Sequence, residues 1–164
     1  MHNKVKDSTI LVTGGAGFIG SYVIEELIPL QPKKIVIIDN FIRGTKENMK
    51  SFIDNPIIEI HHADIRETDK LEQCIAGCDY VFHMAALRIN ACAANPKEGF
   101  DVMLKSTFDV ADLCKKHKVK KVIYSSSASV YGLAQHFPTP ETDNPYNNQT
   151  FYGAAKMWGE QLFR

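Results

Sequence analysis

A tyrosine and a lysine four residues apart, Tyr152 and Lys156, are the first pair in this sequence that could do chemistry. On a helix this spacing places both side chains on one face. An ammonium group beside a phenol favours the phenolate, and lowering a tyrosine pKa from about 10 to about 7 takes roughly 4 kcal/mol. A phenolate at neutral pH can remove a proton from an alcohol as a general base. Alone, a YxxxK pair often occurs by chance and is more typical of an aromatic core contact and a solvated lysine.

A run of serines precedes this pair, at the end of a stretch rich in β-branched residues. The segment YSSSASVYG covers residues 124–132, and Ser127 lies near its centre. Ligands of open parallel sheets bind at the carboxyl ends of the strands. A hydroxyl there could hydrogen-bond a substrate oxygen as it becomes a carbonyl, so Ser127 is the candidate for that role.

A glycine-rich turn near the N-terminus supports a nucleotide-dependent reaction. The segment TGGAGFIG, residues 13–20, places Gly14, Gly17 and Gly20 between a predicted strand and a predicted helix. Gly14 permits the tight turn, Gly17 lets a pyrophosphate approach the backbone, and Gly20 lets the helix pack closely on the strand. The phosphates would lie at the helix N-terminus, where unpaired N–H groups attract an anion. The GxxGxxG spacing differs from GxGxxG, and a glycine triplet alone is a weak signal.

An acid at the end of the next predicted strand strengthens the dinucleotide interpretation. Asp39 follows Gly14 by 25 residues, where a carboxylate can accept hydrogen bonds from both adenosine ribose hydroxyls. A 2′-phosphate would be repelled there, which favours NAD over NADP. Arg43 and Lys46 weaken this preference, because either cation could hold a 2′-phosphate if the loop swung inward.

The elements that must position these residues alternate along the chain. Five short β-branched runs are typical of buried strands: Thr9 to Thr13, Ile35 to Asp39, Ile57 to His61, Tyr80 to His83 and Lys121 to Ser125. Helical spacing of apolar residues predicts helices over Phe18 to Leu30, Asp69 to Ala76, about Pro96 to Lys116, and from an N-cap at Thr150 onward. An irregular stretch, Leu133 to Thr150, separates the last strand from the last helix, and a loop of this length is usually functional.

This alternation predicts an α/β fold, a doubly wound parallel sheet of the Rossmann type with helices on both faces. With 164 residues, 45% of them hydrophobic, the chain fits a single domain over 1–164 with a core that needs no disulfides. The last helix runs toward Arg164 without a terminator, so the chain is expected to stop before the last strand or strands of the sheet.

Composition excludes several kinds of partner. Nineteen Lys and Arg balance nineteen Asp and Glu, so nothing favours nucleic acid or a membrane surface. The N-terminus lacks the apolar core of a secretory signal, and no apolar run approaches the roughly 20 residues of a membrane span. The four cysteines show no zinc-site spacing and are expected to be reduced thiols of a cytoplasmic protein, and no metal site is predicted.

Together these motifs resemble the extended short-chain dehydrogenase/reductases, the NAD-dependent sugar epimerase/dehydratase family. The resemblance extends over nearly the whole chain. It implies an NAD cofactor held by the glycine turn, by the acid and its neighbour, by an adenine clamp after the third strand, and by turns after the fourth and fifth strands. The implied cofactor contacts are Gly14, Gly17, Phe18, Ile19, Gly20, Asp39, Asn40, Asp64, Ile65, Met84, Ala85, Ala86, Arg88 and Ser125, together with Tyr152 and Lys156. Arg43 is added from its place in the loop after Asp39.

The same resemblance implies that Ser127, Tyr152 and Lys156 are catalytic. Dehydratases of the family carry acids after the catalytic hydroxyl residue, whereas Ala128 and Ser129 follow Ser127 and resemble the pattern of UDP-hexose 4-epimerases. The implied activity is a nucleotide-sugar epimerase, with a UDP-linked sugar as substrate. Tyr152 would take the proton of the sugar 4-hydroxyl while NAD takes the C4 hydride, and the 4-keto sugar would be reduced again from its other face.

One departure from the family pattern concerns Met103, where the family usually has Asn, and Ser106, where it has Gly. A thioether accepts hydrogen bonds only weakly, so either another group serves there or the site is loosened. The resemblance also implies a homodimer and a C-terminal substrate domain beyond Arg164. Open alternatives are a reductase, dehydrogenase or dehydratase of the same family, or a catalytically inactive NAD-binding fragment.

Overall fold

A computed structural model describes residues 2–143 and 148–164. The chain forms two compact units. The first contains the residues up to Ala85 together with Asp109–Ile123, and the second contains Ala86–Phe108 and the described residues between Tyr124 and Arg164. The predicted phosphate turn lies in the first unit, and the predicted catalytic residues lie in the second.

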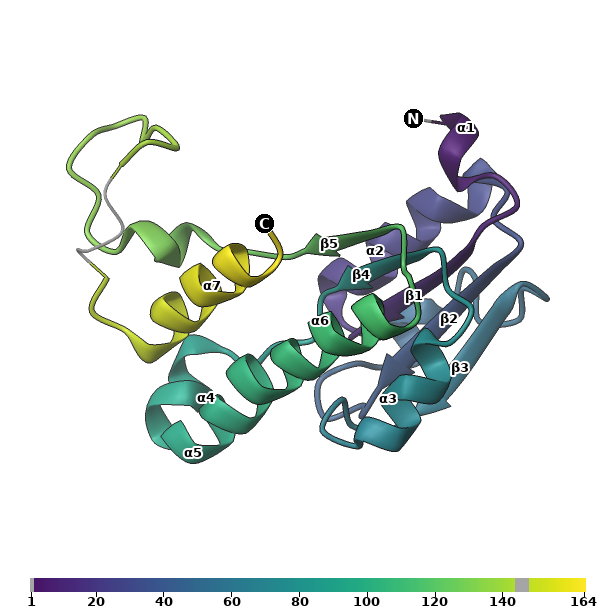
Figure 1. Ribbon diagram of the computed structural model, residues 1–164, viewed down its shortest axis with the longest axis horizontal. Coiled ribbons are helices and arrows are strands. Elements are labelled where there is room, and N and C mark those ends of the chain that lie inside the picture. The colour runs from purple at the N-terminus through teal and green to yellow at the C-terminus, as the bar shows by residue number, and fades with distance from the viewer. Residues whose placement is uncertain (1, 144–147) are drawn as a thin grey trace. The chain divides into compact units, whose positions relative to one another are not determined.

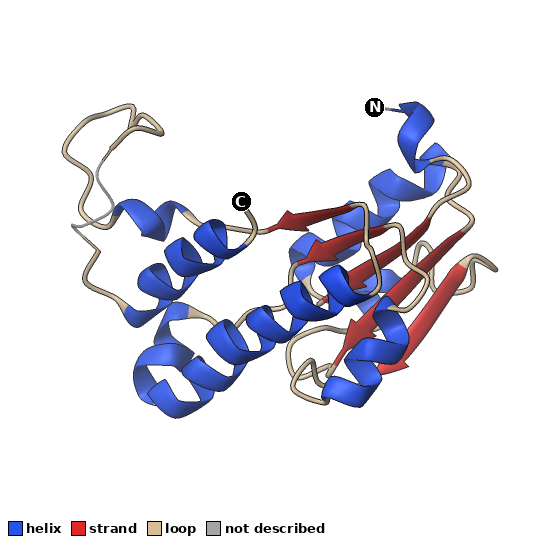
Figure 2. Cartoon of the chain, in the orientation of Figure 1, coloured by secondary structure: helices blue, strands red, loops and turns tan. Residues whose placement is uncertain are grey.

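The first unit is built on a parallel sheet with the strand order β3-β2-β1-β4-β5 (Figure 2). Its strands are β1 (Thr9–Thr13), β2 (Lys34–Asp39), β3 (Ile58–His62), β4 (Tyr80–His83) and β5 (Lys121–Tyr124). Thr13 pairs with His83, and Asp39 pairs with His62, so the carboxyl ends of four strands meet at one edge. The five predicted strands and the parallel α/β fold are confirmed, with ends shifted by one residue at most.

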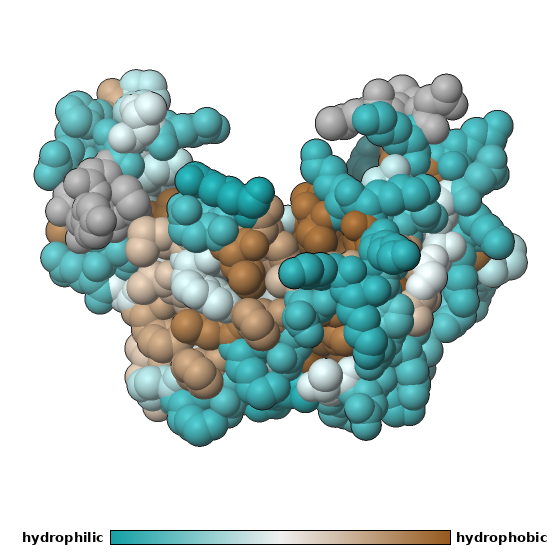
Figure 3. Space-filling view, in the orientation of Figure 1, coloured by the Kyte–Doolittle hydropathy of each residue, from teal (hydrophilic) through white to brown (hydrophobic). Residues whose placement is uncertain are grey.

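Helices cover both faces of this sheet, because its strands are apolar on both sides. Figure 1 shows α2 (Phe18–Leu27) on one face, and α3 (Thr68–Ile75) and the end of α6 (Ser106–Lys116) on the other. The short turns η1 (Ile28–Leu30) and η2 (Glu47–Met49) follow α2 and β2, and a short helix α1 (His2–Val5), which was not predicted, precedes β1. Polar side chains cover the outer side of α3 and α6 in Figure 3.

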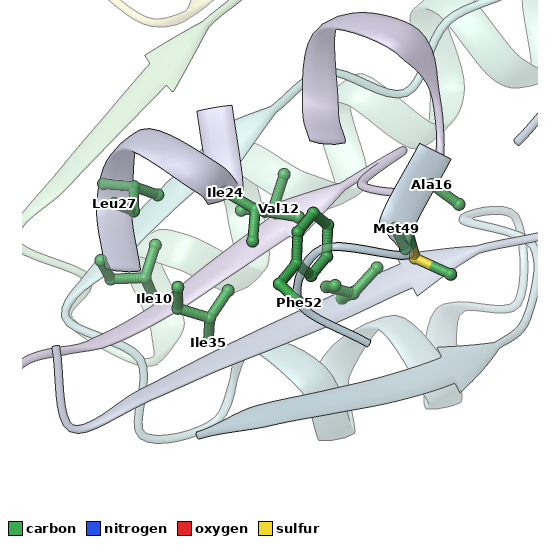
Figure 4. Packing of buried hydrophobic residues seen from close by; sticks show 9 residues of the cluster. Ile10, Val12, Ala16, Ile24, Leu27, Ile35, Met49 and Phe52 are labelled. Atoms are coloured by element: carbon green, nitrogen blue, oxygen red, sulfur yellow. The ribbon is translucent and has the colours of Figure 1, made fainter. Parts of the chain in front are cut away.

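The core on the α2 face explains why this helix packs where it does. Alternate residues of β1 and β2 meet α2 and the segment after η2, and the cluster in Figure 4 is fully buried or nearly so. It consists of Ile10, Val12, Ala16, Ile24, Leu27, Ile35, Ile37, Met49 and Phe52. Because α2 is anchored by this cluster, its N-terminus is held at the end of β1, where the glycine turn delivers it.

The second unit is helical and irregular. It contains α4 (Ile89–Ala94), α5 (Pro96–Gly99), the π-helical segment η3 (Phe100–Lys105), the start of α6, the short turn η4 (Ala128–Tyr131) and α7 (Phe151–Leu162). The sequence predicts α7 with Thr150 as N-cap, and the Gly153 N–H donates to Thr150 Oγ1 at 3.0 Å, which confirms the cap. The helix ends at Leu162 rather than running to Arg164.

The prediction of one regular helix from Pro96 to Lys116 is wrong in its middle. The backbone N–H of Ser106 donates to the carbonyl of Asp101, five residues earlier, and the Ser106 hydroxyl donates to the same oxygen at 2.9 Å. These bonds widen the turn into the π-helical segment that carries Met103. Helix α4 was not predicted, because six residues are too few to show an apolar periodicity.

Candidate cofactor and active site

The glycine turn after β1 has the geometry of a phosphate cradle. Gly14 has a φ of +70°, and a Cβ there would lie 2.8 Å from the backbone nitrogen of Ala85. A Cβ on Gly20 would lie 2.3 Å from the carbonyl oxygen of Gly14, so helix and turn touch. Gly17 precedes α2, and no side chain caps the helix there. The first N–H groups of α2 therefore have no carbonyl acceptor within the helix and no side-chain cap, and they can hold a diphosphate.

The exposed start of α2 supplies two further predicted contacts. Phe18 is 74% exposed and Ile19 is 60% exposed, although both are large apolar residues next to the glycine turn. A bound dinucleotide would cover such side chains. The residues of the turn thus fit the diphosphate of NAD both in shape and in available donors.

Asp39 lies at the end of β2, almost fully buried, and its carboxylate has a structural role that the sequence did not reveal. One oxygen accepts the N–H of Ala16 at 3.0 Å, and the other accepts the N–H of Phe41 at 2.8 Å. The acid therefore fixes the phosphate turn to the loop after β2. Because each carboxylate oxygen has a second lone-pair site, the predicted bonds to ribose hydroxyls remain possible.

The loop after β2 rests directly on the phosphate turn. The carbonyl of Ala16 accepts the N–H of Thr45 at 3.1 Å and the side-chain amide of Asn48 at 2.8 Å. A Cβ on Gly44 would lie 2.6 Å from the Ala16 Cβ, so only glycine fits there. Gly44 and Asn48 were not predicted from the sequence, since neither belongs to a periodic pattern. Arg43 lies on this loop and is exposed.

The residues of the predicted adenine clamp, Asp64 and Ile65, lie beside Asn40. The Asn40 amide donates to Asp64 Oδ2 at 2.8 Å, and Ile65 beside it is buried. Arg66 donates to both oxygens of Asp64, each at 2.8 Å. The Arg66 guanidinium holds the pKa of Asp64 at about 2, against desolvation that would raise it. Asp64 is therefore an ionised acceptor at neutral pH.

The turn after β4 is tied to the end of β1. Thr13 Oγ1 lies 2.8 Å from Nδ1 of the buried His83 and accepts the N–H of Ala85 at 3.1 Å. The N–H of Met84 donates to the Thr13 carbonyl at 3.1 Å. The predicted contacts Met84 and Ala85 are thus held beside Gly14 within the first unit.

In the second unit, Met103 accepts the hydrogen bond that the sequence left in question. The N–H of Leu87 donates to Met103 Sδ, with 3.2 Å between nitrogen and sulfur. Sδ of methionine and Oδ1 of asparagine both stand three bonds from Cα, so a thioether can take the acceptor position of an amide. Met103 thereby holds the segment between Ala86 and Arg88, and Arg88 precedes α4 with its side chain exposed.

Ser127 caps the short turn η4. Its Oγ accepts the N–H of Ser129 at 3.1 Å. The hydroxyl is half-buried, and accepting this bond leaves its proton available to donate to a substrate oxygen. The geometry is compatible with the role expected for this serine.

Tyr152 and Lys156 share one face of α7, as their spacing predicts. Lys156 Nζ lies 5.9 Å from the centre of the Tyr152 ring and donates to the carbonyl of Ser125 at 2.6 Å. Burial lowers the pKa of Lys156 to about 8, and Cys92 opposes this effect. The lysine is therefore mostly protonated at neutral pH, and its charge acts in a site with little water to screen it.

Asn148 joins η4 to the start of α7 and was not singled out in the sequence. Its amide donates to the Ser129 carbonyl at 2.8 Å, and its Oδ1 accepts the N–H of Thr150 at 2.9 Å. A Cβ on Gly153 would collide with this amide at 2.1 Å. The Asn148 side chain therefore links the turn that follows Ser127 to the start of the helix that carries Tyr152.

The remaining candidates for chemistry are few. All four cysteines are free and buried, and burial raises the pKa of Cys74 to about 11 and those of Cys78 and Cys114 to about 12. Within residues 2–143 and 148–164, no cluster of His, Cys, Asp and Glu is arranged to hold a metal ion. In the same part of the chain, no helix combines the length and apolar character needed to cross a membrane.

Comparison with known proteins places the chain in a family. Residues 10–164 match the NAD dependent epimerase/dehydratase family, so the chain belongs to it. This match confirms the family resemblance drawn from the motifs. It also confirms the predicted cofactor, because the family is NAD dependent.

Relatives and solved structures agree with this assignment. The UDP-glucose 4-epimerase of Dictyostelium discoideum is 34% identical, over 96% of this chain and 47% of the relative, and that of Bacillus subtilis is 33% identical, over 94% and 47%. A UDP-N-acetylglucosamine 4-epimerase from Methanobrevibacter ruminantium M1, in complex with UDP-N-acetylmuramic acid, superposes with a TM-score of 0.87 at 35% identity, covering 95% of this chain and 49% of that one. The UDP-glucose 4-epimerase from Bifidobacterium longum, in complex with NAD+ and UDP, gives 0.86 at 32% identity, covering 96% and 48%. The chain thus spans about half the length of the relatives it matches.

Proposed function

We propose that this chain is the NAD-binding and catalytic part of a nucleotide-sugar 4-epimerase acting on a UDP-linked sugar. The observation that carries the proposal is the arrangement in the second unit. A buried, protonated Lys156 lies beside Tyr152 on one helix face, and the Ser127 hydroxyl has a proton to donate. The four relatives described above are all 4-epimerases of UDP-sugars.

The chain's own residues would handle the proton. Tyr152, with the charge of Lys156 beside it, takes the proton from the sugar 4-hydroxyl as general base and later returns it. Ser127 donates a hydrogen bond to the same oxygen while it has carbonyl character. NAD, when bound, supplies the reversible acceptance of a hydride from C4. Within this scheme Lys156 also holds the nicotinamide ribose, and Ser125 lies near the nicotinamide.

In the first unit, the chain would hold the other end of the cofactor. The glycine turn and the start of α2 bind the diphosphate, and Asp39 accepts from the ribose hydroxyls. Asn40, Asp64 and Ile65 receive the adenine. Asp64 acts there by holding Asn40 and Arg66, whose N–H groups occupy the acceptor sites of both carboxylate oxygens. Met84 and Ala85 after β4 are proposed to face the cofactor in this unit, and the exposed Arg43 is a further proposed contact on the loop after β2. Ala86 and Arg88 are the proposed contacts of the same turn that belong to the second unit.

The absence of an acid after Ser127 favours epimerisation over dehydration, because expelling water requires a group that protonates the leaving hydroxyl. Ala128 and Ser129 stand at those positions.

We further propose a homodimer in the cytoplasm. The four reduced cysteines support the compartment. The exposed apolar side chains Ile89, Phe100 and Phe108, over the helices of the second unit where Figure 3 shows hydrophobic residues, support self-association.

The test uses the complete reading frame that contains these residues, purified with its bound cofactor. UDP-sugars are incubated without added NAD, and the products are separated by chromatography. Interconversion of 4-epimers with no accumulation of NADH absorbance is expected. Accumulation of NADH in step with product would instead indicate a dehydrogenase, and a 4-keto-6-deoxy product would indicate a dehydratase. Tyr152→Phe is the matched control: turnover should vanish while the cofactor stays bound.

A further inference from the structure

Lys156 lies in surroundings that are uncommon for a buried cation. Its residue is 3% exposed, and among the described residues its ammonium group contacts a carbonyl and two aromatic rings rather than a carboxylate. Nζ lies 4.8 Å from the centre of the Tyr124 ring, closer than the 5.9 Å to the Tyr152 ring. Both distances are within the roughly 6 Å over which a cation is attracted to an aromatic face.

The Tyr124 ring is held by the same helix that carries the lysine. A Cβ on Gly159 would lie 2.4 Å from both Cζ and the hydroxyl oxygen of Tyr124, so α7 leaves room for the ring only because residue 159 is glycine. The ring of Phe163 packs against Tyr124 with 5.2 Å between centroids. Lys156 and Gly159 share one helix face, because they are three positions apart, and Phe163 is the C-cap residue directly after the helix. The helix therefore fixes both the ring and the cation above it.

The phenol of Tyr124 contributes no charge of its own. Burial raises its pKa far above the ordinary value, and Tyr152 and Glu160 raise it further. At any pH of interest the ring is neutral, and its face attracts a cation through the quadrupole rather than through an ionised oxygen.

We propose that Tyr124 is a positioning residue for Lys156, whose ring face holds the ammonium group by cation–π attraction and leaves its positive charge uncancelled beside Tyr152. A carboxylate in the same place would also bind the ammonium group, but its negative charge would cancel the positive field of Lys156 at Tyr152. The ring compensates part of the cost of desolvation without that cancellation. The importance of this arrangement for turnover rests on the proposed function, whereas the arrangement itself can be tested without it.

Other titratable groups on α7 and on the elements packed against it could also affect the pKa of Lys156. They are Cys92 on α4, Lys97 and Glu98 on α5, Asp101 and Lys105 in η3, Tyr131 in η4, and Tyr152 and Glu160 on α7 itself. Glu160 accepts a hydrogen bond from Ser126. Of these groups Cys92 acts on the pKa of Lys156, in the raising direction and less than burial lowers it.

The experiment measures the pKa of Lys156 by NMR titration of the chain carrying isotope-labelled lysine, with the Lys156→Met variant used to assign the signal. Tyr124→Phe is the matched control, since it keeps the ring face and removes only the hydroxyl. Tyr124→Leu keeps an apolar side chain and removes the ring. The Phe variant should titrate as the wild type does, and the Leu variant should titrate roughly 0.5 to 1.5 pH units lower, because the charged form loses its aromatic partner.

A second series decides the matter if the Leu variant does not fold. Phenylalanines with increasing numbers of ring fluorines at position 124 keep the shape of the side chain and progressively weaken the attraction of its face for a cation. The pKa of Lys156 should fall stepwise along this series. An unchanged pKa in the Leu variant, or along the fluorinated series, would overturn the proposal even if the complete enzyme proves to be an epimerase. A falling pKa in a protein that epimerises no sugar would uphold the arrangement and reject the function.

Discussion

Replacing Asp39 with asparagine exchanges a carboxylate, both of whose oxygens accept a backbone hydrogen bond, for an amide with a single acceptor oxygen. In the native chain these oxygens receive the N–H groups of Ala16 and Phe41, at 3.0 and 2.8 Å. The amide of asparagine has nearly the same shape but only one oxygen, and its NH2 group is a donor. Whichever way the amide turns, one backbone N–H must face another donor.

The size of the effect follows from the burial of this side chain, which is 8% exposed. A buried donor left without a partner costs about 1 to 3 kcal/mol, and the surviving bond loses its charge assistance. We therefore expect the free energy of unfolding to fall by about 1 to 3 kcal/mol. For a chain of this size that corresponds to a melting temperature lower by roughly 2 to 12 °C.

The assay is urea unfolding of the isolated chain followed by circular dichroism, with NAD titration by calorimetry as a second measurement. NAD binding should weaken along with stability, because the Ala16 bond is one of those that hold the phosphate turn. Asp79→Asn is the matched control. Asp79 also accepts one backbone N–H, that of Thr9 at 2.8 Å, but its other oxygen pairs with a Lys120 side chain that is 65% exposed and can turn to water.

Asp79→Asn should therefore cost clearly less than Asp39→Asn. If the two variants unfold alike, or if Asp39→Asn unfolds like the wild type, the double hydrogen bond does not hold the turn as described. If stability falls and NAD binding does not, the turn is not the part of the cofactor site that this acid organises.

Two further predictions concern buried groups of the second unit. Met103→Leu should lower the free energy of unfolding by about 1 kcal/mol or more, because the Leu87 N–H loses its acceptor. Met103→Asn should keep that hydrogen bond through Oδ1. Urea unfolding compares the two variants, and equal losses of stability in both would show that packing and not the acceptor matters. Lys156→Met should raise the free energy of unfolding at pH 7, by at most about 3 kcal/mol, because the folded-state pKa of about 8 lies below the ordinary 10.5 and folding disfavours the charged form. That gain should shrink as the pH rises from about 8, where Lys156 loses its proton in the folded chain, to about 10.5, where it also loses its proton in the unfolded chain. A gain that does not depend on pH would contradict burial as the cause.

The five strands, the helices α2, α3 and α7, the glycine turn and the shared face of Tyr152 and Lys156 could be predicted from the sequence, because each depends on residues close together along the chain. A period of two or 3.6 residues sets which face is apolar, and a glycine at a positive φ marks a turn wherever it occurs. The family resemblance rests on the same local motifs, which explains why the comparisons confirmed it.

Other features were decided only by the tertiary structure. Asp39 reaches Ala16 across 23 positions, Leu87 meets Met103 across 16, and Tyr124 lies under Lys156 across 32. No spacing rule connects such pairs, because their contact depends on how the elements between them pack. The lowered pKa of Lys156 is of the same kind, since desolvation is a property of everything around a group and not of its neighbours in the chain. The π-helical turn at Phe100–Lys105 likewise depends on the two bonds to the Asp101 carbonyl, which turn an ordinary helical pattern into a wider one.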